Sequence, residues 1–168
     1  DLLCHHGIAR EVSAIYGRKL KVPEVFELKD DESIFNLSIE NGEDCARYTA
    51  AFIENVKIAP SPEWMQKLLL SAGMKPINNI VDVTNFVLLE LGQPLHAFDR
   101  DTLDGDSIVV RRARKGEKIR TLDEIERELD EEILVIADTS KPIALAGVMG
   151  GLETEVTSST SRVVLESA

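Results

Sequence analysis

The sequence contains little that would place it in a membrane or among disulfide-stabilised proteins. Its 168 residues include only two cysteines, Cys4 and Cys45, which lie far apart and form no C-x-x-C motif. We interpret them as reduced thiols of a cytoplasmic protein. No apolar run is long enough to cross a bilayer, and polar residues follow soon after Asp1. We therefore expect neither a membrane span nor a signal peptide.

Aromatic residues and positive charges are also scarce. Aromatic side chains make up 5% of the sequence, so branched aliphatic residues must fill most of the core. Lys and Arg number 19 against 30 Asp and Glu, which gives a net charge of −11. This argues against a broad nucleic-acid clamp, because affinity for phosphates comes from basic side chains, but it permits contact with a nucleic-acid end. Acidic residues concentrate in 117–132, which we expect to form a solvent-exposed face.

Several common catalytic and metal motifs are absent. No His or Cys cluster has the spacing of a zinc site, and no G-x-S-x-G occurs. The glycine-rich run at 144–151 lacks the order of a phosphate-binding loop. We therefore expect no metal site, and the candidates that remain are isolated residues rather than a known constellation.

Helical patterns occupy the first half of the chain and strand patterns the second. Apolar periodicity predicts helices over 2–16, 62–72 and 78–91, with Ser61 as an N-cap and with Gly73 and Gly92 as stops. Short β-branched runs predict strands over 47–58, 107–111, 117–122, 133–137, 143–148 and 162–167. Helices followed by strands favour an α+β fold over alternating βαβ units.

His96 is the first candidate for a functional site. It follows a helix stop at Gly92 and a turn fixed by Pro94. One interpretation is a histidine that caps an element or lies at the edge of the core. The other is an imidazole directed into a cleft, where it could position a water or a substrate carbonyl near neutral pH.

The glycine-rich run ALAGVMGG at 144–151 is the second candidate. Three glycines in five positions allow close approach of the backbone to a ligand, or a positive φ. The alternative is a tight connection between two strands.

Glu166 is the third candidate, because it interrupts the apolar strand RVVLESA. Its carboxylate is either exposed on an edge strand or buried with a partner. A buried charge is costly without hydrogen bonds, so a buried Glu166 would require a donor.

The order and spacing of several segments resemble one known family. CARYTAAF at 45–52, VDVTN and LGQPLHAFD within 81–99, LVIAD at 134–138, ALAGVMGG and VVLESA closely resemble the B3/B4 domain in the β subunits of bacterial phenylalanyl-tRNA synthetases. The opening DLLCHHGIAREVSAIYG resembles the segment before it, which belongs to the B1 domain. The resemblance implies an α+β fold of mixed, sandwich-like sheets flanked by helices. It divides the chain into a B1-like segment and linker at 1–36 and a B3/B4 domain at 37–168.

In that family the B3/B4 domain is the proofreading site, which hydrolyses tyrosine wrongly esterified to the 3′ end of phenylalanine tRNA. The resemblance assigns the editing histidine to His96 and recognition of the tyrosine hydroxyl to Glu166. It assigns the lining of the pocket to Gly147 and Gly150. It further assigns a turn to Pro94 and contact near the terminal adenosine to Lys75.

The resemblance also implies partners and cofactors. The chain would belong to a cytoplasmic ligase that attaches phenylalanine to its tRNA, in an α2β2 assembly with an α subunit. ATP and Mg²⁺ would serve the whole synthetase, and no cofactor would bind this segment. The alternative function is a non-catalytic structural or tRNA-positioning module of the same subunit.

The sequence departs from the family pattern in three places. Ala146-Gly147 replaces a Gly-Gly pair of some relatives, which would trim the pocket, and Asp123-Glu124 replaces an Asp-Gly turn. The family completes its pocket with a threonine-containing segment beyond the position of Ala168. We therefore expect this chain to hold only part of the site.

Overall fold

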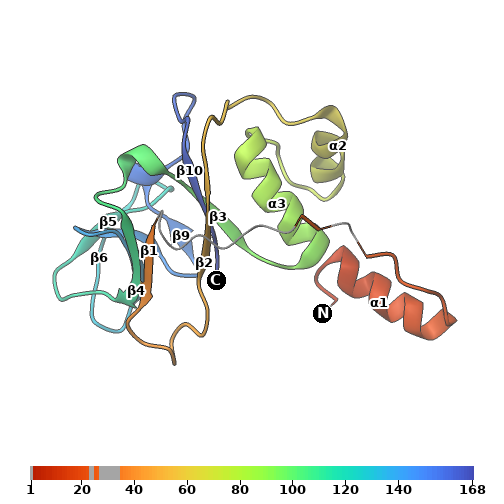
Figure 1. The fold of residues 1–168 in the computed structure, drawn as a ribbon, viewed down its shortest axis with the longest axis horizontal. Helices are drawn as coiled ribbons and strands as arrows, with labels where there is room; N and C mark the ends of the chain where they lie inside the picture. Colours follow the sequence, from red (N-terminus) through yellow and green to blue (C-terminus); the bar gives the residue numbers. More distant parts are fainter. Residues whose placement is uncertain (1, 23–24, 27–34) are drawn as a thin grey trace. The chain divides into compact units, whose positions relative to one another are not determined.

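The computed structural model describes residues 2–22, 25–26 and 35–168, which form helices and strands in two compact units (Figure 1). The helical unit comprises the described residues within 1–31 together with 60–95, and the β unit those within 32–59 and 96–168. The elements are α1 (His5–Tyr16), β1 (Asn36–Ile39), β2 (Thr49–Ile53), α2 (Glu63–Ser71), α3 (Asn79–Leu91), β3 (Leu95–Asp99), η1 (Arg100–Thr102), β4 (Ser107–Arg112), β5 (Lys118–Arg120), β6 (Glu126–Glu128), β7 (Leu134–Ala137), β8 (Pro142–Leu145), β9 (Met149–Gly150), η2 (Leu152–Thr154) and β10 (Val163–Ser167).

The three predicted helices are present, and capping residues account for the ends of α1 and α3. The side chain of Asn78 accepts hydrogen bonds from the first backbone N–H groups of α3, and Gly92 ends the helix in the left-handed conformation with φ 78°. Gly17 ends α1 in the same way. Within residues 2–22, 25–26 and 35–168, no helix is both long and apolar enough to span a membrane.

The prediction that Ser61 is the N-cap of α2 is wrong. The helix begins at Glu63 with Pro62 in the cap position, and no side chain caps it. The Ser61 hydroxyl is buried and donates a hydrogen bond to Asp82 of α3 instead. Asp82 is fully buried and also accepts a hydrogen bond of 2.8 Å from the backbone N–H of Ile77. Satisfying a buried carboxylate outweighs a local helix cap, because an unpaired buried charge costs more than an exposed helix end.

The β unit contains two larger sheets and a small hairpin. In the three-stranded sheet, β10 lies between β2 and β3, and in the five-stranded sheet the order is β1-β4-β7-β8-β9. β1 pairs with β4 in parallel, whereas β4, β7, β8 and β9 pair in antiparallel fashion. β5 and β6 form the hairpin. These sheets and the three helices confirm the predicted α+β class.

The main hydrophobic core joins the two larger sheets. Phe98 of β3 and Val164 of β10 belong to the same buried cluster as Val110 of β4, Ile136 of β7 and Ile143 of β8. Burying a side chain of this size contributes about 1.5–3 kcal/mol. The shared core fixes how the inner faces of the two sheets meet, and residues at the edge of the cluster are therefore held in place.

Most predicted strands are present with altered bounds, but sequence patterns missed β1, β3, β6 and β9. The strand predicted over 143–148 ends early, because β8 stops at Leu145 and residues 146–148 form a turn, after which β9 returns along β8. The miss at β3 matters most for function. No strand was predicted after the turn at Pro94, yet residues Leu95–Asp99 form a strand that carries His96.

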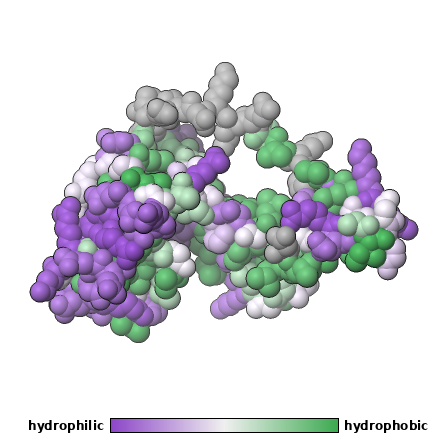
Figure 2. Space-filling model, turned by 90° about the horizontal axis from the view of Figure 1, so that it is seen from below, coloured by the Kyte–Doolittle hydropathy of each residue, from purple (hydrophilic) through white to green (hydrophobic). Residues whose placement is uncertain are grey.

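The acidic stretch 117–132 is mainly exposed, as predicted. The hydrophilic surface at the left of Figure 2 covers this part of the β unit, around β5 and β6. Glu117 is the main exception, because both of its oxygens accept hydrogen bonds from the buried guanidinium of Arg111, at 2.7 and 2.8 Å.

Replacing Ser61 with alanine should destabilise the helical unit by about 1–3 kcal/mol, because a buried acceptor on Asp82 loses its donor. Urea unfolding followed by the fluorescence of Trp64, the single tryptophan, reports on this unit. Ser71→Ala, at an exposed position of α2, is the matched control and should change stability by less than about 0.5 kcal/mol. Equal effects of the two substitutions would contradict the assigned role of Ser61.

Candidate functional site

Strand β3 determines where the imidazole of His96 lies. His96 and Phe98 are two residues apart on the strand and therefore share one face. Their rings contact edge-to-face, with centroids 4.7 Å apart and an interplanar angle of 75°. Phe98 is fully buried in the core, so His96 sits at the edge of that core. The buried carboxylate of Asp99 fixes the end of the strand by accepting a 2.5 Å hydrogen bond from Thr160.

Gly150 packs directly against the ring of His96. It lies on β9, the edge strand of the five-stranded sheet, whereas His96 belongs to the three-stranded sheet. A Cβ atom added at residue 150 would lie 2.5 Å from Cε1 of His96 and closer still to Nε2. Real Cβ atoms do not approach other heavy atoms so closely. The absence of a side chain at residue 150 therefore permits the two sheets to meet at His96.

The Nε2 atom of His96 has no hydrogen-bond partner although it is buried. Of the side-chain nitrogen and oxygen atoms in the described part of the chain, it is the one buried atom without such a partner. Burial lowers the pKa of His96 below its ordinary value, so the ring is neutral at pH 7. Unsatisfied buried polar atoms are rare in native proteins and require an explanation, of which a catalytic or ligand-binding role is one.

Glu166 is buried on the central strand of its sheet, which decides between the two interpretations of the sequence. It lies on β10 opposite Ala50 of β2, and the residue is 9% exposed. The donor that a buried carboxylate requires is Tyr48, whose hydroxyl donates a hydrogen bond to Oε2 of Glu166. Burial raises the pKa of Glu166 to about 7, although the hydrogen bond from Tyr48 lowers it.

His96 and Glu166 occupy the same face of the three-stranded sheet. Glu166 shares its face of β10 with Val164, and His96 shares its face of β3 with Phe98. Val164 and Phe98 belong to one core cluster, and β3 and β10 are adjacent strands. The fold therefore places a neutral imidazole and a buried carboxylate on one face of the three-stranded sheet, with the backbone of Gly150 packed against the imidazole.

The remaining predicted site residues lie elsewhere. Gly147 is exposed in the turn between β8 and β9, with φ 68° and open space where a Cβ would be. A glycine is needed at residue 147 because the turn requires a positive φ. The glycine-rich run is therefore a tight connection between strands at Gly147, whereas at Gly150 it allows close packing of the backbone against His96. Lys75, in the loop between α2 and α3, and Pro94, before β3, are exposed residues of the helical unit.

Sequence reasoning missed Tyr48 as a partner of the site. It was predicted only as one of the alternating residues of a strand, and it precedes that strand by one residue. Tyr48 and Glu166 are 118 positions apart, so no local pattern could pair them. The one available signal was that a buried Glu166 would require a donor, and the hydroxyl of Tyr48 is such a donor.

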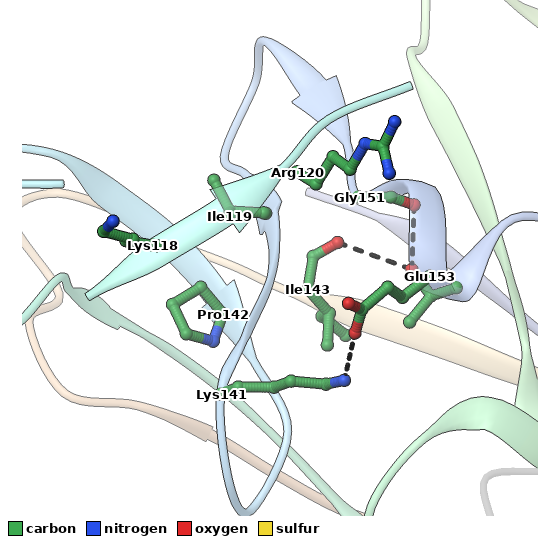
Figure 3. A pocket seen from close by; sticks show the side chains of 9 residues that line it. Lys118, Ile119, Arg120, Lys141, Pro142, Ile143, Gly151 and Glu153 are labelled. Carbon is green, nitrogen blue, oxygen red and sulfur yellow. Dashed lines mark hydrogen bonds and ion pairs between the residues drawn. The ribbon is translucent and has the colours of Figure 1, made fainter. Parts of the chain in front are cut away.

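The β unit also contains a polar pocket (Figure 3). Its lining comes from β5, β8 and the segment after β9, and includes the cationic side chains of Lys118, Arg120 and Lys141. Lys141 forms an ion pair with Glu153, and Lys118 forms one of 3.2 Å with Glu126. Gly151, the last residue of the glycine-rich run, lines this pocket, whereas His96, Gly150 and Glu166 do not.

The described residues contain no group of three or more His, Cys, Asp or Glu side chains that could hold a metal ion.

Adding a methyl group at residue 150 should disturb the site. We expect Gly150→Ala to destabilise the β unit by about 1–3 kcal/mol, because the new Cβ overlaps the His96 ring and the ring must move. Urea unfolding followed by circular dichroism measures the loss. The matched control is Gly42→Ala, since a Cβ at residue 42 meets open space and its φ is ordinary. A Gly150→Ala chain as stable as the control would contradict the observed contact.

The buried carboxylate should make stability depend on pH. The folded-state pKa of Glu166 is about 7, above its ordinary 4.5. Its contribution is therefore most favourable below about pH 4.5 and is lost as the pH rises through 7, by about 3 kcal/mol at about 1.4 kcal/mol per pH unit. Gln cannot titrate, so Glu166→Gln should gain stability relative to the unmodified chain between about pH 5 and about pH 8.

Unfolding free energies at these two pH values test this expectation. Glu131→Gln, at an exposed position, is the control and should follow the unmodified chain at both. A stability difference between Glu166→Gln and the unmodified chain that does not change with pH would contradict the raised pKa.

Comparisons with known proteins agree with the resemblance seen in the sequence. The family model described as the B3/4 domain matches residues 44–168. The phenylalanine–tRNA ligase beta subunits of Moorella thermoacetica and Carboxydothermus hydrogenoformans are each 54% identical to this chain over its whole length. The chain spans 21% of the length of each of these relatives.

A solved structure shares the fold. An N-terminal fragment of the phenylalanyl-tRNA synthetase beta subunit from Pyrococcus horikoshii matches 96% of this chain and 50% of its own length, with a TM-score of 0.60 and 18% sequence identity. The family match covers most of the sequence and nearly all of the β unit, including His96, Gly150 and Glu166. The chain belongs to the B3/4 domain family.

Proposed function

We propose that this chain is the editing domain of a phenylalanine–tRNA ligase β subunit, and that it hydrolyses tyrosine wrongly esterified to the 3′ end of phenylalanine tRNA. The observation that carries the proposal is the buried carboxylate of Glu166 on the same sheet face as the His96–Gly150 contact. The similarity to β subunits of this ligase supports the choice of substrate.

The proposed selection of tyrosine follows from hydrogen bonding. An apolar synthetic pocket rejects an analogue with one extra hydroxyl by only about 10²-fold, which is too little for accurate translation. A second site must therefore select for that hydroxyl. A carboxylate among apolar neighbours accepts the phenolic O–H in a charge-assisted bond worth about 1.5–3 kcal/mol, or about 10- to 150-fold. Phenylalanine would leave the carboxylate of Glu166 without this donor.

The proposed hydrolysis needs no covalent nucleophile, because an aminoacyl ester is already activated. His96 is neutral, and its unpaired Nε2 is suited to hold a water or the substrate beside the ester. Which ring nitrogen carries the proton decides whether Nε2 donates or accepts there. The backbone N–H of Gly150, which packs against His96, is proposed to bind the substrate or the developing oxyanion, whereas Gly147 serves the turn between β8 and β9.

Other parts of the proposed assembly lie outside this site. Pro94 fixes the turn before His96, and Lys75 supplies a positive charge for the terminal adenosine of the tRNA. The net charge of −11 is compatible with a domain that receives only the tRNA end while other domains bind its body. ATP and Mg²⁺ would serve aminoacylation by the whole α2β2 synthetase in the cytoplasm, and no step here uses them.

Glu166→Ala tests the proposed function in the β subunit assembled with its α subunit. We expect deacylation of Tyr-tRNA to slow by at least about tenfold, because the hydroxyl loses its acceptor, while attachment of phenylalanine is unchanged. Glu131→Ala, at an exposed residue, is the matched control and should clear tyrosine normally. If the unmodified synthetase attaches phenylalanine but never deacylates Tyr-tRNA, the chain is a structural or tRNA-positioning module instead.

A further inference from the structure

Tyr48 is held against Glu166 by the pairing of β2 and β10. Thr49 lies opposite Ser167 and Ala50 opposite Glu166, so Tyr48 immediately precedes the paired region. Its ring is buried in the main core, with 9% of the residue exposed. The hydroxyl at the end of the ring reaches Oε2 of the carboxylate. The ring cannot leave this position without disrupting the core, so the hydroxyl is a fixed donor.

The two oxygens of Glu166 have different surroundings. Oε2 accepts the hydrogen bond from Tyr48, whereas Oε1 accepts none from any described residue. An unpartnered oxygen that was fully buried would stand beside His96 Nε2, which is the one such side-chain atom in the described ranges. Oε1 is not such an atom, and Glu166 as a residue remains 9% exposed. One carboxylate oxygen is therefore occupied, and the other keeps accessible surface.

From this asymmetry we infer that Tyr48 is a positioning residue for selection of the substrate: its hydroxyl fixes Oε2 of Glu166 and so presents Oε1 to the hydroxyl of the incoming tyrosine. The inference rests on the proposed editing function and assigns a residue that the proposal did not include. Glu166 would then hold two phenols at once, one from the protein and one from the substrate.

The charge state of the pair suits this role. Burial and the charge of Glu166 raise the pKa of Tyr48 above its ordinary value, so its hydroxyl remains a donor at neutral pH. The same hydrogen bond counteracts the effect of burial on Glu166, whose pKa is about 7. Besides Glu166, the titratable group that affects the pKa of Tyr48 is Cys45, and His96 on the adjacent strand β3 is neutral. Loss of the Tyr48 hydroxyl would therefore favour the protonated carboxyl, a weaker acceptor.

Tyr48→Phe in the assembled synthetase removes the hydroxyl and keeps the ring in the core. We expect kcat/KM for deacylation of Tyr-tRNA to fall about tenfold at pH 7, with attachment of phenylalanine unchanged. The rate is measured between about pH 6 and about pH 8.5 and corrected for spontaneous hydrolysis. The acid limb, which is the fall in kcat/KM at low pH as Glu166 is protonated, should move to higher pH in Tyr48→Phe. Tyr16→Phe is the matched control, because Tyr16 is 71% exposed on α1 and should have no effect.

The outcomes separate the inference from the proposed function. An unmodified synthetase that does not deacylate Tyr-tRNA overturns both. Deacylation that is lost in Glu166→Ala but keeps its rate and pH profile in Tyr48→Phe overturns only the role of Tyr48. A purely structural role would lower the stability of Tyr48→Phe without moving the acid limb.

A second substitution covers the case in which Tyr48→Phe does not fold. Site-specific replacement of Tyr48 by 3-fluorotyrosine keeps the hydroxyl and makes it a stronger donor. The acid limb should then move to lower pH, opposite to the shift in Tyr48→Phe. An unchanged limb would overturn the inference.

Discussion

The packing of two sheets around one core is the constraint on which the rest of the β unit depends. The inner faces of the sheets share a cluster that includes Phe98, Val164 and Ile143, and at the edge of this cluster the sheets must still approach closely. The chain meets this requirement at Gly150, which has no side chain to separate β9 from His96. Because protein interiors are packed as densely as organic crystals, a single extra methyl group at residue 150 would displace atoms of both sheets. The candidate site is thus placed by packing before any chemistry is considered.

Within this core, hydrogen bonding separates buried polar groups that stabilise the fold from those that are candidates for a functional role. Asp82 is satisfied by Ser61 and a backbone N–H, and Asp99 by Thr160 and the N–H of Asp101. These carboxylates connect separate segments and have full sets of partners, as expected of groups that stabilise the fold. His96 departs from this rule, because its buried Nε2 is left unpaired. The same sheet face carries Glu166, so the departure coincides with the candidate site.

Local signals in the sequence were sufficient for the helices and for much of the β structure. Asn78 and Gly92 mark the ends of α3 because capping depends on a few neighbouring residues. Strand β3 was missed because its last three residues, Ala97 to Asp99, are all buried and give no alternation of period two. Ser61 was misassigned for a related reason, since its partner lies 21 residues away and competes with the local cap. What could not be predicted depends on tertiary contacts.

The candidate site follows the same division. His96, Gly150 and Glu166 could be selected from the sequence, but their arrangement depends on the strand order β2-β10-β3 and on the contact between His96 and β9. The family resemblance supplied the roles, and the geometry supplied a partner that the resemblance did not contain. Only the structure identifies Tyr48 as the donor that satisfies the buried carboxylate of Glu166.

Another carboxylate of the same unit explains why that donor is a phenol. Glu117 has both oxygens taken by the guanidinium of Arg111, and this pairing lowers its pKa, so it has little capacity left for a ligand. Glu166 instead has one oxygen taken by a neutral hydroxyl, and burial raises its pKa to about 7. A cation at residue 48 would hold Glu166 ionised but would compete for the second oxygen. A neutral, rigid donor fixes the carboxylate and leaves one acceptor for a ligand that brings its own hydroxyl.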